Sequence, residues 1–434
     1  MELIETEFKQ TEVGLIPVDW EVFVLSDVLN GIADVDHYMP QSRKDGIPYV
    51  MTGNLKELAS NINFNDCKKI SADDYKRLSK KIKNLKGDVI LARYATIGTV
   101  SYVDIDFDFV VSYSCVTVKS NPSKLLGMFL FYYFKSSVFE IEVKNKVNAN
   151  TQSNVGIGDL NTMKIALPTL QEQDIIVKAL SDVDALIHSL ETLIAKKKAI
   201  KQGAMQELLT GKTRLVGFEN DKGYQQTEVG LIPVDWEVRL ASDIAEVRSG
   251  KRLPKGNALQ DTETSQPYIR VADMFNGGVE LKNIKYVPES VSLQISNYRI
   301  YKDDIFISVA GTLGICGMIP LILDGANLTE NANRFTNIQC DKKFLLYILL
   351  SPLIQNLINS SKTLGAQPKL ALVRIRNFAI PLPPTLKEQR AIAETLSNMD
   401  QEIQTLQTKK EKYQAIKQGM MQELLTGKTR LISS

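Results

Sequence analysis

"AIKQGAMQELLTGKTRL" occupies residues 199–215, and "AIKQGMMQELLTGKTRL" occupies residues 415–431. The two stretches differ at a single position. A second stretch, "QTEVGLIPVDWEV", stands at residues 10–22 and returns letter for letter at residues 226–238. Both repeats are displaced by 216 positions. Solenoid units have only about 20–50 residues, so this spacing indicates a duplicated domain.

Length and composition agree with two or more domains. The chain has 434 residues, more than one hydrophobic core usually supports. Its longest apolar run, Leu125–Phe134, is about half of what a membrane span requires. The start, "MELIETEFKQ", lacks the pattern of a signal peptide, and the four cysteines show no close pairing. We therefore expect a cytoplasmic protein with no membrane partner.

Two segments carry the strongest structural pattern, because their apolar residues step by four and three as in a coiled coil. These residues are Ile176, Leu180, Val183, Ile187, Leu190 and Ile194, and then Ile392, Leu396, Met399, Ile403 and Leu406. "PTLQEQ" and "PTLKEQ" place Thr169 and Thr385 as N-caps, each followed three residues later by a glutamate. This spacing predicts a capping box at the start of each helix.

The connection between the halves favours antiparallel pairing of the two helices. Only residues 216–226 separate the first helix from the second globular part. A parallel pair would force that part to reach back along the whole helix, which so short a linker makes awkward. The alternative, in which each helix packs only on its own globular part, stays open at this point.

The globular stretches combine strands and helices. "GDVILARYATIGTVSYV" and "DDIFISVAGTLGICGMI" stand at the same offset, and each predicts a strand, a turn and a second strand. We predict an α+β fold with two mixed α/β globular domains separated by a long antiparallel two-helix coiled coil, related by a pseudo-twofold internal repeat. The predicted segments are a first domain 1–170, a central helix 171–215, a linker 216–226, a second domain 227–386 and a C-terminal helix 387–434.

The repeat preserves the helices but not the domain surfaces. "NGIADVDHYMPQSRKDGIPYV" and "VRSGKRLPKGNALQDTETSQPYI" share little beyond a Pro-Tyr pair. A chain of this kind can offer two equivalent docking sites and two different ligand specificities. Net charge is only +2, so any contact with DNA must come from local basic regions such as Lys68–Lys86 and Arg239–Lys255. Solvated surface remains the alternative reading of both regions.

Several motifs suggest catalysis but do not support it. "TGKT" at 210–213 and 426–429 resembles the end of a phosphate loop, yet Gln206 and Gln422 stand where glycine is required. Two triplets, Glu-Val-Lys at 142–144 and Glu-Leu-Lys at 280–282, fit chance in so charged a chain. The only histidines are His37 and His188, and no Asn/Asp-Pro-Pro-aromatic tetrad occurs. We expect no catalytic residues and no metal site.

Taken together, six stretches carry a family resemblance: "GLIPVDWEV", "SGKRLPKG", "PYIRVADM", "AGTLGICGM", "GAQPKLALVRIRNFAIPLPPTLKEQRAIAETL" and "QGMMQELLTGKTRL". By their order and duplication, essentially the whole chain resembles the specificity subunit of type I restriction-modification enzymes. The resemblance implies two target recognition domains that each read half of a split sequence in double-stranded DNA. It also implies that the paired helices hold these domains apart and that two adenine-methyltransferase subunits dock on the repeated regions.

Further partners and all cofactors follow from the same resemblance. ATP-driven restriction subunits would join the complete complex, an adenine-specific DNA methyltransferase and ATP-dependent endonuclease. S-adenosylmethionine, ATP and Mg²⁺ would belong to the partner subunits, and this chain would hold none. The second class of function left open is a non-catalytic coiled-coil scaffold whose domains bind proteins. Salt-dependent, sequence-selective DNA binding distinguishes the two.

Phosphate contacts are expected from lysine and arginine, and base contacts from these and from Asn, Gln and Thr. The DNA-binding candidates are Arg43, Lys44, Lys68, Lys69, Arg93, Thr151 and Gln152 in the first domain and Arg248, Lys251, Arg252, Lys255, Gln367 and Lys369 in the second. In the first domain "NGIADVDH" replaces "SGKRLPKG" and "NANTQSNV" replaces "GAQPKL", so it departs from the family pattern. The partner-binding candidates lie in the repeated stretches: Trp20, Trp236, Gln202, Gln206, Gln418 and Gln422.

Overall fold

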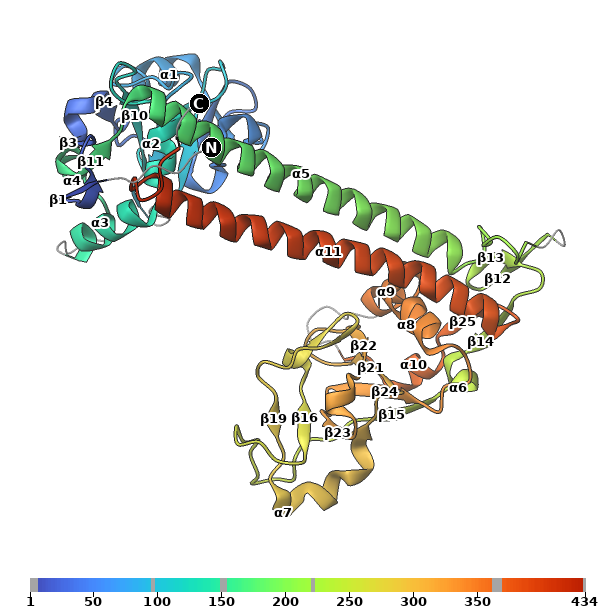
Figure 1. The fold of residues 1–434 in the computed structure, drawn as a ribbon. Coiled ribbons are helices and arrows are strands. Elements are labelled where there is room, and N and C mark those ends of the chain that lie inside the picture. The colour runs from blue at the N-terminus through green and yellow to red at the C-terminus, as the bar shows by residue number, and fades with distance from the viewer. Residues whose placement is uncertain (1–6, 95–97, 149–153, 220–222, 361–368, 432–434) are drawn as a thin grey trace. The chain divides into compact units, whose positions relative to one another are not determined.

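The computed structural model describes residues 7–94, 98–148, 154–219, 223–360 and 369–431 (Figure 1). The chain divides into two compact units. The first unit contains residues 1–191 and 408–434, and the second contains residues 192–407. Each unit therefore holds one globular part together with a piece of each long helix.

The globular part of the first unit contains an antiparallel sheet of order β4-β10-β7-β8 and a smaller sheet of order β6-β5-β9, in which β5 and β9 are parallel. The strands are β4 Leu29–Ala33, β5 Ile47–Val50, β6 Lys68–Ile70, β7 Val89–Ala92, β8 Val100–Tyr102, β9 Val110–Val111 and β10 Cys115–Ser120. The helices are α1 Ala72–Leu78, α2 Gly127–Phe134, α3 Ser137–Asn148 and α4 Ile157–Thr162. Helix α2 buries an unbroken run of aromatic and aliphatic residues, which explains its apolar sequence.

The second unit repeats this plan. Its antiparallel sheet has the order β15-β24-β21-β22, and a second sheet has the order β19-β16-β23-β20. The strands are β15 Glu246–Ser249, β16 Pro267–Ile269, β17 Met274–Phe275, β18 Gly278–Val279, β19 Lys285–Tyr286, β20 Arg299–Ile300, β21 Ile305–Ser308, β22 Cys316–Met318, β23 Ala326–Leu328 and β24 Ala332–Thr336. The helices are α6 Ala241–Ile244, α7 Glu289–Ser292, α8 Lys342–Leu350, α9 Pro352–Ser360 and α10 Leu372–Arg376. The predicted strand, turn and strand of each half are therefore β7 and β8, and β21 and β22.

Small sheets connect each globular part to the helices. A hairpin of β1 (Phe8–Thr11) and β2 (Gly14–Pro17) begins the first unit, and β12 (Tyr224–Thr227) and β13 (Gly230–Pro233) form the same hairpin in the second. Strand β3 (Glu21–Val24) pairs with β11 (Lys164–Leu167), and β14 (Glu237–Leu240) pairs with β25 (Ala379–Leu382). Because β11 and β25 lead directly into the long helices, these pairs fix where each helix starts.

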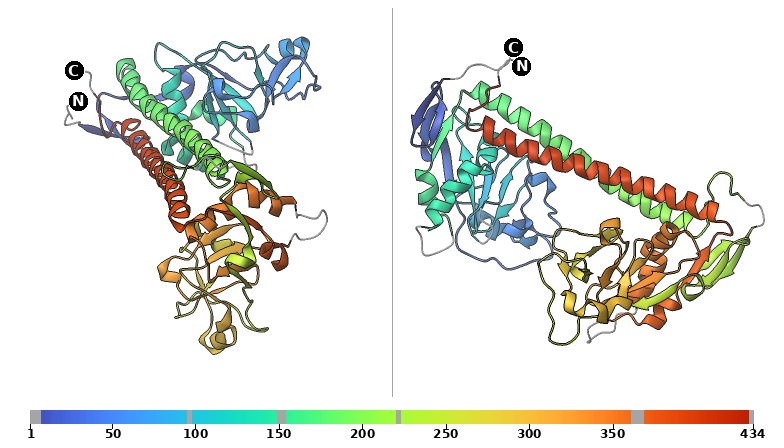
Figure 2. Two further views of the ribbon diagram at one scale, coloured as in Figure 1. Left: turned by 90° about the vertical axis from the view of Figure 1, so that its right-hand side faces the viewer. Right: turned by 60° about the horizontal axis from the view of Figure 1, so that its bottom comes forward.

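The long helices α5 (Leu170–Leu208) and α11 (Leu386–Leu424) have 39 residues each and lie side by side (Figures 1 and 2). In the second unit Lys197 pairs with Glu402 and Lys201 with Asp400. In the first unit Asp184 pairs with Lys417 and Glu191 with Lys410. In both units the residue number rises along one helix as it falls along the other, so the helices run antiparallel. The predicted fold class, with two mixed α/β parts and an antiparallel helix pair, is confirmed.

At the start of each long helix, only one of the two hydrogen bonds of the predicted capping box is present. The N–H groups of Glu172 and Glu388 donate to the hydroxyls of Thr169 and Thr385 at 3.3 and 3.2 Å, so both threonines are N-caps. The carboxylates of the two glutamates do not return to the capping residue. Each accepts hydrogen bonds from an arginine at the far end of the partner helix, as described below. A charged donor competes successfully with a backbone N–H, because charge-assisted hydrogen bonds are about twice as strong.

Each globular part and its helices share one core. In the first unit the core joins Ile176 and Leu180 of α5 to Met421 and Leu424 of α11 and to the buried face of α2. The second unit joins Met205 and Leu208 of α5 to Ile392 and Leu396 of α11 in the same manner. Among the described residues, no helix is both long enough and apolar enough to span a bilayer.

Candidate nucleic-acid interface

Four short segments of the second unit meet at one end of its main sheet: residues 250–255, 309–311, 328–331 and 369–370. We call them the second-unit loop cluster. The N–H of Lys251 donates to the carbonyl of Leu328 at 2.8 Å, and the N–H of Val309 donates to that of Asn331 at 2.7 Å. The N–H of Leu370 donates to the carbonyl of Val309 at 2.9 Å. This chain of backbone hydrogen bonds places residues far apart in sequence on one surface.

The glycine of "SGKRLPKG" is required by this close approach of loops. A Cβ atom at Gly250 would lie 2.0 Å from the carbonyl oxygen of Thr329, a distance that no side chain can occupy. The N–H of Gly250 also donates to the carbonyl of Ala332 at 3.0 Å. The basic residues that follow the glycine are therefore held on a loop that is fixed to the sheet.

The second-unit loop cluster exposes most of the cations predicted for it. Lys251, Lys255 and Lys369 are exposed, and they form no ion pair with another described residue. The Arg252 side chain is 75% exposed, with its Nε 3.0 Å from Oε1 of Glu330. On the adjoining strand β15, the Nε of Arg248 lies 2.9 Å from Oε2 of Glu246. Exposed ion pairs contribute only about 0–1 kcal/mol, so both arginines can exchange a carboxylate for a DNA phosphate at small cost.

The first unit forms the same loop arrangement from different residues. The N–H of Arg93 donates to the carbonyl of Ser114 at 2.9 Å, and the N–H of Val155 donates to that of Arg93 at 3.3 Å. Tyr94 and Asn154 form an isolated β-bridge, as Ala310 and Lys369 do in the second unit. We call residues 34–38, 93–94, 112–114 and 154–155 the first-unit loop cluster. Two of the backbone hydrogen bonds that join the second-unit loops therefore have counterparts in the first unit, although the side chains of the two units differ.

Arg93 does not have the surface position that we predicted. Its side chain is buried, and its Nη2 lies 2.5 Å from Oδ2 of Asp34, while Nζ of Lys81 lies 2.6 Å from Oδ1 of the same carboxylate. Burial acts to raise the pKa of Asp34, but the Lys81 hydrogen bond and the Arg93 charge outweigh it and lower that pKa. Arg93 thus neutralises a buried carboxylate and holds the 34–38 loop to strand β7. A buried Asp34 carboxylate without a positive partner would destabilise the fold, and this is why the Arg93 side chain points inward.

The other first-unit candidates differ in exposure. Arg43 and Lys44 are exposed, whereas Lys68 and Lys69 are half-buried. The ammonium of Lys68 donates to the carbonyl of Pro40, and the carbonyl of Lys69 accepts the N–H of Arg43 at 3.0 Å. Arg43 and Lys44 are therefore the more accessible of these four cations. Three candidates, Thr151, Gln152 and Gln367, lie outside the described residues.

Sequence reasoning missed an aromatic pair in the first-unit loop cluster. The rings of His37 and Tyr113 stack with centroids 4.8 Å apart, and the His37 side chain is 62% exposed. Both residues could hydrogen-bond to the edge of a base. The available signal was the histidine in the divergent "NGIADVDH" stretch, but its partner stands far along the chain and no spacing rule connects them.

The repeated stretches meet at two equivalent junctions. In the first unit, Arg430 binds Glu172 at 2.6 and 2.7 Å and Asp19 at 2.8 and 2.9 Å. The indole N–H of Trp20 donates to the same glutamate at 3.3 Å. A Cβ atom at Gly427 would lie 2.4 Å from the ring of Pro17. The end of α11 is therefore closed onto the beginning of the chain.

The second unit contains the same junction at an offset of 216. Arg214 lies 2.7 Å from Glu388 and 3.0 Å from Asp235. Burial raises the pKa of Glu388, and the charge and hydrogen bond of Arg214 oppose that shift. A Cβ atom at Gly211 would lie 2.6 Å from the ring of Pro233. The identity of the repeated stretches thus has a structural cause, because both copies build one three-way contact.

The predicted partner-binding residues fall into two groups. Trp20 and Trp236 are buried in the junctions, with 0% and 2% of their surface exposed, so neither indole is available to another protein. The prediction that these tryptophans face a partner is therefore wrong. The sequences around them are identical because both copies form the same contact within the chain. Gln202, Gln206, Gln418 and Gln422 are exposed on the long helices.

Comparison with known proteins identifies the family of this doubled arrangement. Residues 17–202 and again residues 233–417 match the family described as the type I restriction modification DNA specificity domain. The chain belongs to this family. As a specificity-domain protein, it carries two copies, one in each half of the 216-residue repeat.

Curated relatives are similar over nearly the whole length of this specificity-domain protein. A chain of Methanocaldococcus jannaschii, named as the MjaX specificity subunit of a type I restriction enzyme, is 30% identical, and the alignment covers 98% of this chain and 97% of the relative. The type I restriction enzyme MjaVIII specificity subunit of the same organism is 26% identical over 98% and 97% of the two chains. The EcoBI specificity subunit of Escherichia coli is 26% identical over 58% and 56%.

Solved structures share the fold at low sequence identity. A chain of a type I R-M system, solved in work on complex assembly and conformational transition, aligns with a TM-score of 0.57 and 18% identity over 95% of this chain and 99% of that one. The S subunit of a type I restriction-modification system from M. genitalium aligns with a TM-score of 0.54 and 16% identity over 99% and 100%. These likenesses support the fold.

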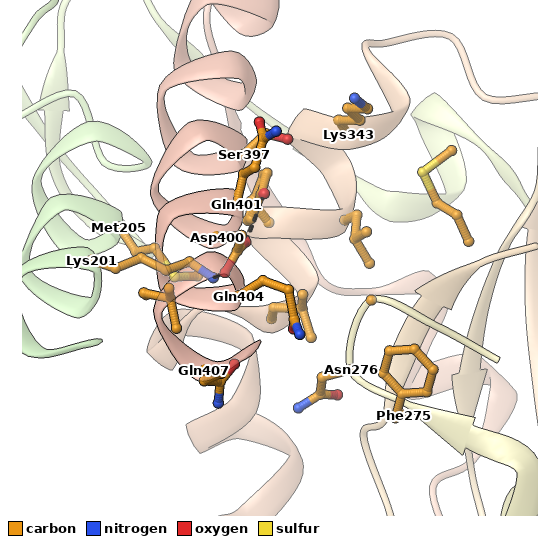
Figure 3. A pocket seen from close by; sticks show the side chains of 16 residues that line it. Lys201, Met205, Phe275, Asn276, Lys343, Ser397, Asp400, Gln401, Gln404 and Gln407 are labelled. Atoms are coloured by element: carbon orange, nitrogen blue, oxygen red, sulfur yellow. Dashed lines mark hydrogen bonds and ion pairs between the residues drawn. The ribbon is translucent and has the colours of Figure 1, made fainter. Parts of the chain in front are cut away.

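A further repeated contact fastens each globular part of this specificity-domain protein to its helices. In the second unit the hydroxyl of Tyr347 donates to Asp400 at 2.9 Å. The ammonium of Lys201, from α5, lies 2.5 Å from the same carboxylate (Figure 3). In the first unit Tyr132 donates to Asp184 at 2.8 Å, and Lys417 of α11 pairs with it at 2.5 Å. Burial raises the pKa of both tyrosines. We call these groups the latches.

A cavity adjoins each latch. The second-unit cavity has a volume of about 730 Å³ and is bordered by the amides of Gln401, Gln404 and Gln407 of α11 and by Asn276 (Figure 3). The first-unit cavity has a volume of about 630 Å³, with His188 and Glu191 where the second has glutamines. The latch residues are common to both walls, and so are a serine (Ser181 and Ser397) and an isoleucine (Ile187 and Ile403). The repeated chemistry of these cavities is therefore the attachment of the globular part to the helix pair.

Proposed function

We propose that this chain is the DNA sequence-specificity subunit of a type I restriction-modification complex, in which each globular part reads one half of a bipartite, asymmetric target. The observation that carries the proposal is the loop cluster, in which two backbone hydrogen bonds and a β-bridge recur in both units while the side chains differ. The same backbone arrangement with different loop side chains in each unit is suited to the recognition of two different half-sites. The exposed cations grip phosphates, and loop side chains such as His37 and Arg252 reach base edges.

The long helices have two roles in this proposal. Their length sets the number of base pairs between the half-sites, and two adenine-methyltransferase subunits dock on the repeated regions. Cofactor binding and base flipping take place in those subunits, and restriction subunits add the ATP-dependent activity. The chain itself contributes recognition without catalysis. We also propose that it works in the cytoplasm, consistent with four buried and unpaired cysteines.

The test is co-expression of the chain with the methyltransferase subunit of the same system, followed by sequencing of methylated adenines in the cellular DNA. The expected result is a single split sequence with a constant gap. The purified chain alone should transfer no methyl group and cut no DNA, and should bind DNA with a steep dependence on salt. Methyl transfer by the rigorously purified single chain, or salt-independent association with proteins only, would contradict the proposal.

A further inference from the structure

His37 is exposed to solvent, yet two contacts hold its imidazole ring. The Tyr113 ring stacks on it with the centroids 4.8 Å apart and an angle of 25° between the planes. The Nε2 atom of His37 lies 3.5 Å from Oδ2 of Asp34, although 62% of the histidine side chain is exposed. A ring that is already oriented loses less entropy when a ligand binds to it. The first-unit loop cluster therefore presents a preorganised imidazole at its surface.

The fold does not require His37 to balance the charge of Asp34. This buried carboxylate already has two cationic partners, with Arg93 at 2.5 Å and Lys81 at 2.6 Å. Two further charged side chains border the same loop: Asp36, which is exposed on the loop itself, and Arg77 of α1, whose guanidinium stacks on the Tyr38 ring at 4.2 Å. Since a histidine that the fold does not need is oriented on the surface expected to meet DNA, a role in binding is indicated.

The second unit has no counterpart of this histidine. The 216-residue offset places different residues at the same positions: Gly250, Leu253 and Val309 in place of Asp34, His37 and Arg93. The cations of the second-unit loop cluster are lysines and arginines, which keep their charge throughout the neutral pH range. Histidine is the side chain whose charge ordinarily changes between about pH 5 and pH 8. The only other histidine in the sequence, His188, lies on α5, so a titration of the loops in this range would be confined to the first unit.

The protonation state of His37 determines which hydrogen bonds its ring can form with a base. The Nε2 atom beside the Asp34 carboxylate carries a hydrogen, because two acceptors would repel each other. The Nδ1 atom then has a lone pair in the neutral ring and an N–H group in the imidazolium. In the major groove, guanine presents two acceptors, N7 and O6, whereas adenine presents one acceptor beside a donor. A protonated ring, which has only donors, is therefore matched to guanine.

We propose that His37 is a specificity-determining residue that binds a guanine of the first half-site in its protonated form, an inference that rests on the proposed function. DNA binding then takes up a proton, because the guanine acceptors and the nearby phosphates stabilise the imidazolium. A group that is more readily protonated in the complex than in the unbound protein contributes affinity at low pH, and this contribution is lost as the pH rises. Recognition of the first half-site weakens above about pH 7, and recognition of the second does not change.

The test measures binding of the full chain to a duplex that carries the target identified by sequencing the methylated adenines. Fluorescence anisotropy titrations cover about pH 5.5 to pH 8.5 at one ionic strength. Three variants are compared: His37→Gln, which cannot titrate; His37→Arg, which is always charged and can bind guanine; and His188→Gln, the control, whose native side chain lines the first-unit cavity. Duplexes in which 7-deazaguanine replaces each guanine in turn remove the N7 acceptor at a known position. Unfolding temperatures at each pH confirm that every variant is folded.

The expected result is a loss of about tenfold in affinity between about pH 6 and pH 8 for the wild type and for His188→Gln. His37→Gln should bind weakly and His37→Arg tightly at every pH, and 7-deazaguanine at one position of the first half-site should reproduce the effect of His37→Gln. If His37→Gln keeps the pH dependence, the inference is overturned and the proposed function stands. An equal pH dependence on DNA without the target would also overturn it, by assigning His37 to a phosphate. If no duplex is bound selectively at any pH, the proposed function fails as well.

Discussion

The contact between the two ends of the chain makes a quantitative prediction. Arg430→Met removes a guanidinium that binds Glu172 and Asp19 and preserves much of the side-chain volume. The two carboxylates differ in burial, since the Glu172 side chain is 9% exposed and that of Asp19 is 52% exposed. The loss of the Glu172 contact should therefore dominate.

The magnitude follows from this difference. The exposed pair with Asp19 contributes at most about 1 kcal/mol. Hydrogen bonds to charged groups contribute about 1.5–3 kcal/mol, and removal of the arginine leaves the Glu172 carboxylate buried with only the Trp20 indole as its donor. We expect a local destabilisation of about 2–3 kcal/mol, which raises the opening equilibrium constant of the junction about 30- to 150-fold.

Hydrogen exchange resolved by mass spectrometry is the suitable assay, because two units need not unfold in one step. Exchange should accelerate in the β1–β2 hairpin and in the last turn of α11, and stay unchanged in β12–β13. Lys428→Met is the matched control, since Lys428 is exposed in the same turn. Adding Glu172→Gln to Arg430→Met should recover part of the lost protection by removing the unpaired charge. Wild-type exchange in the Arg430 variant would refute the reasoning.

Acid should weaken the same junction. The hydrogen bond from Arg430 lowers the pKa of Asp19 below its usual 3.8, against a smaller opposing effect of burial. A carboxylate with a lowered pKa in the folded state contributes stability that is present above its unfolded pKa and is lost as the pH falls through the folded pKa. Protection of β1–β2 should therefore decline below about pH 4 in the wild type. The Arg430 variant should show less of this decline in the same range.

Four further variants have defined outcomes. Gly427→Ala should lower the unfolding temperature, because φ at this residue is +69° and a Cβ would lie 2.4 Å from the ring of Pro17. Gly203→Ala, in open space within α5, should raise the free energy of unfolding by about 0.5–1 kcal/mol. Equal effects of the two substitutions would contradict the packing argument. Lys251→Ala should weaken binding to all DNA sequences and reduce the slope of log binding constant against log salt concentration by about one. Titrations at several salt concentrations measure this slope, and an unchanged slope would exclude a phosphate contact. Four residues inserted after both Leu190 and Leu406 add about 6 Å and should lengthen the gap of the methylated target by roughly two base pairs. An active variant that keeps the original gap would show that the helices do not measure the distance.

The sequence predicted the features that repeat or follow local periodicity. The helix pair, its direction and both N-caps could be derived from apolar spacing and linker length, because these depend on neighbouring residues. The partner of Glu172 could not be derived. Arg430 stands 258 residues away, and the local capping rule pointed to the backbone of Thr169 instead.

Loop side chains show the same limit at the site. Arg93 stands on a strand end like a surface cation, and only the folded chain brings Asp34 to it. His37 and Tyr113 likewise become neighbours through strand order, which no local pattern encodes. The burial of Trp20 and Trp236 could not be predicted for a related reason. A repeated sequence indicates that both copies make the same contact, but it does not indicate whether that contact is within the chain or with a partner.

The central claim is that each globular part reads its own half of a DNA target. The most direct test replaces Phe23–Pro168 with the equivalent stretch Arg239–Pro384, co-expresses the hybrid with the methyltransferase subunit, and sequences the methylated adenines. The account predicts a symmetric target, with the half-site of the second unit present twice as an inverted repeat. Methylation of the original asymmetric sequence by the hybrid would contradict it.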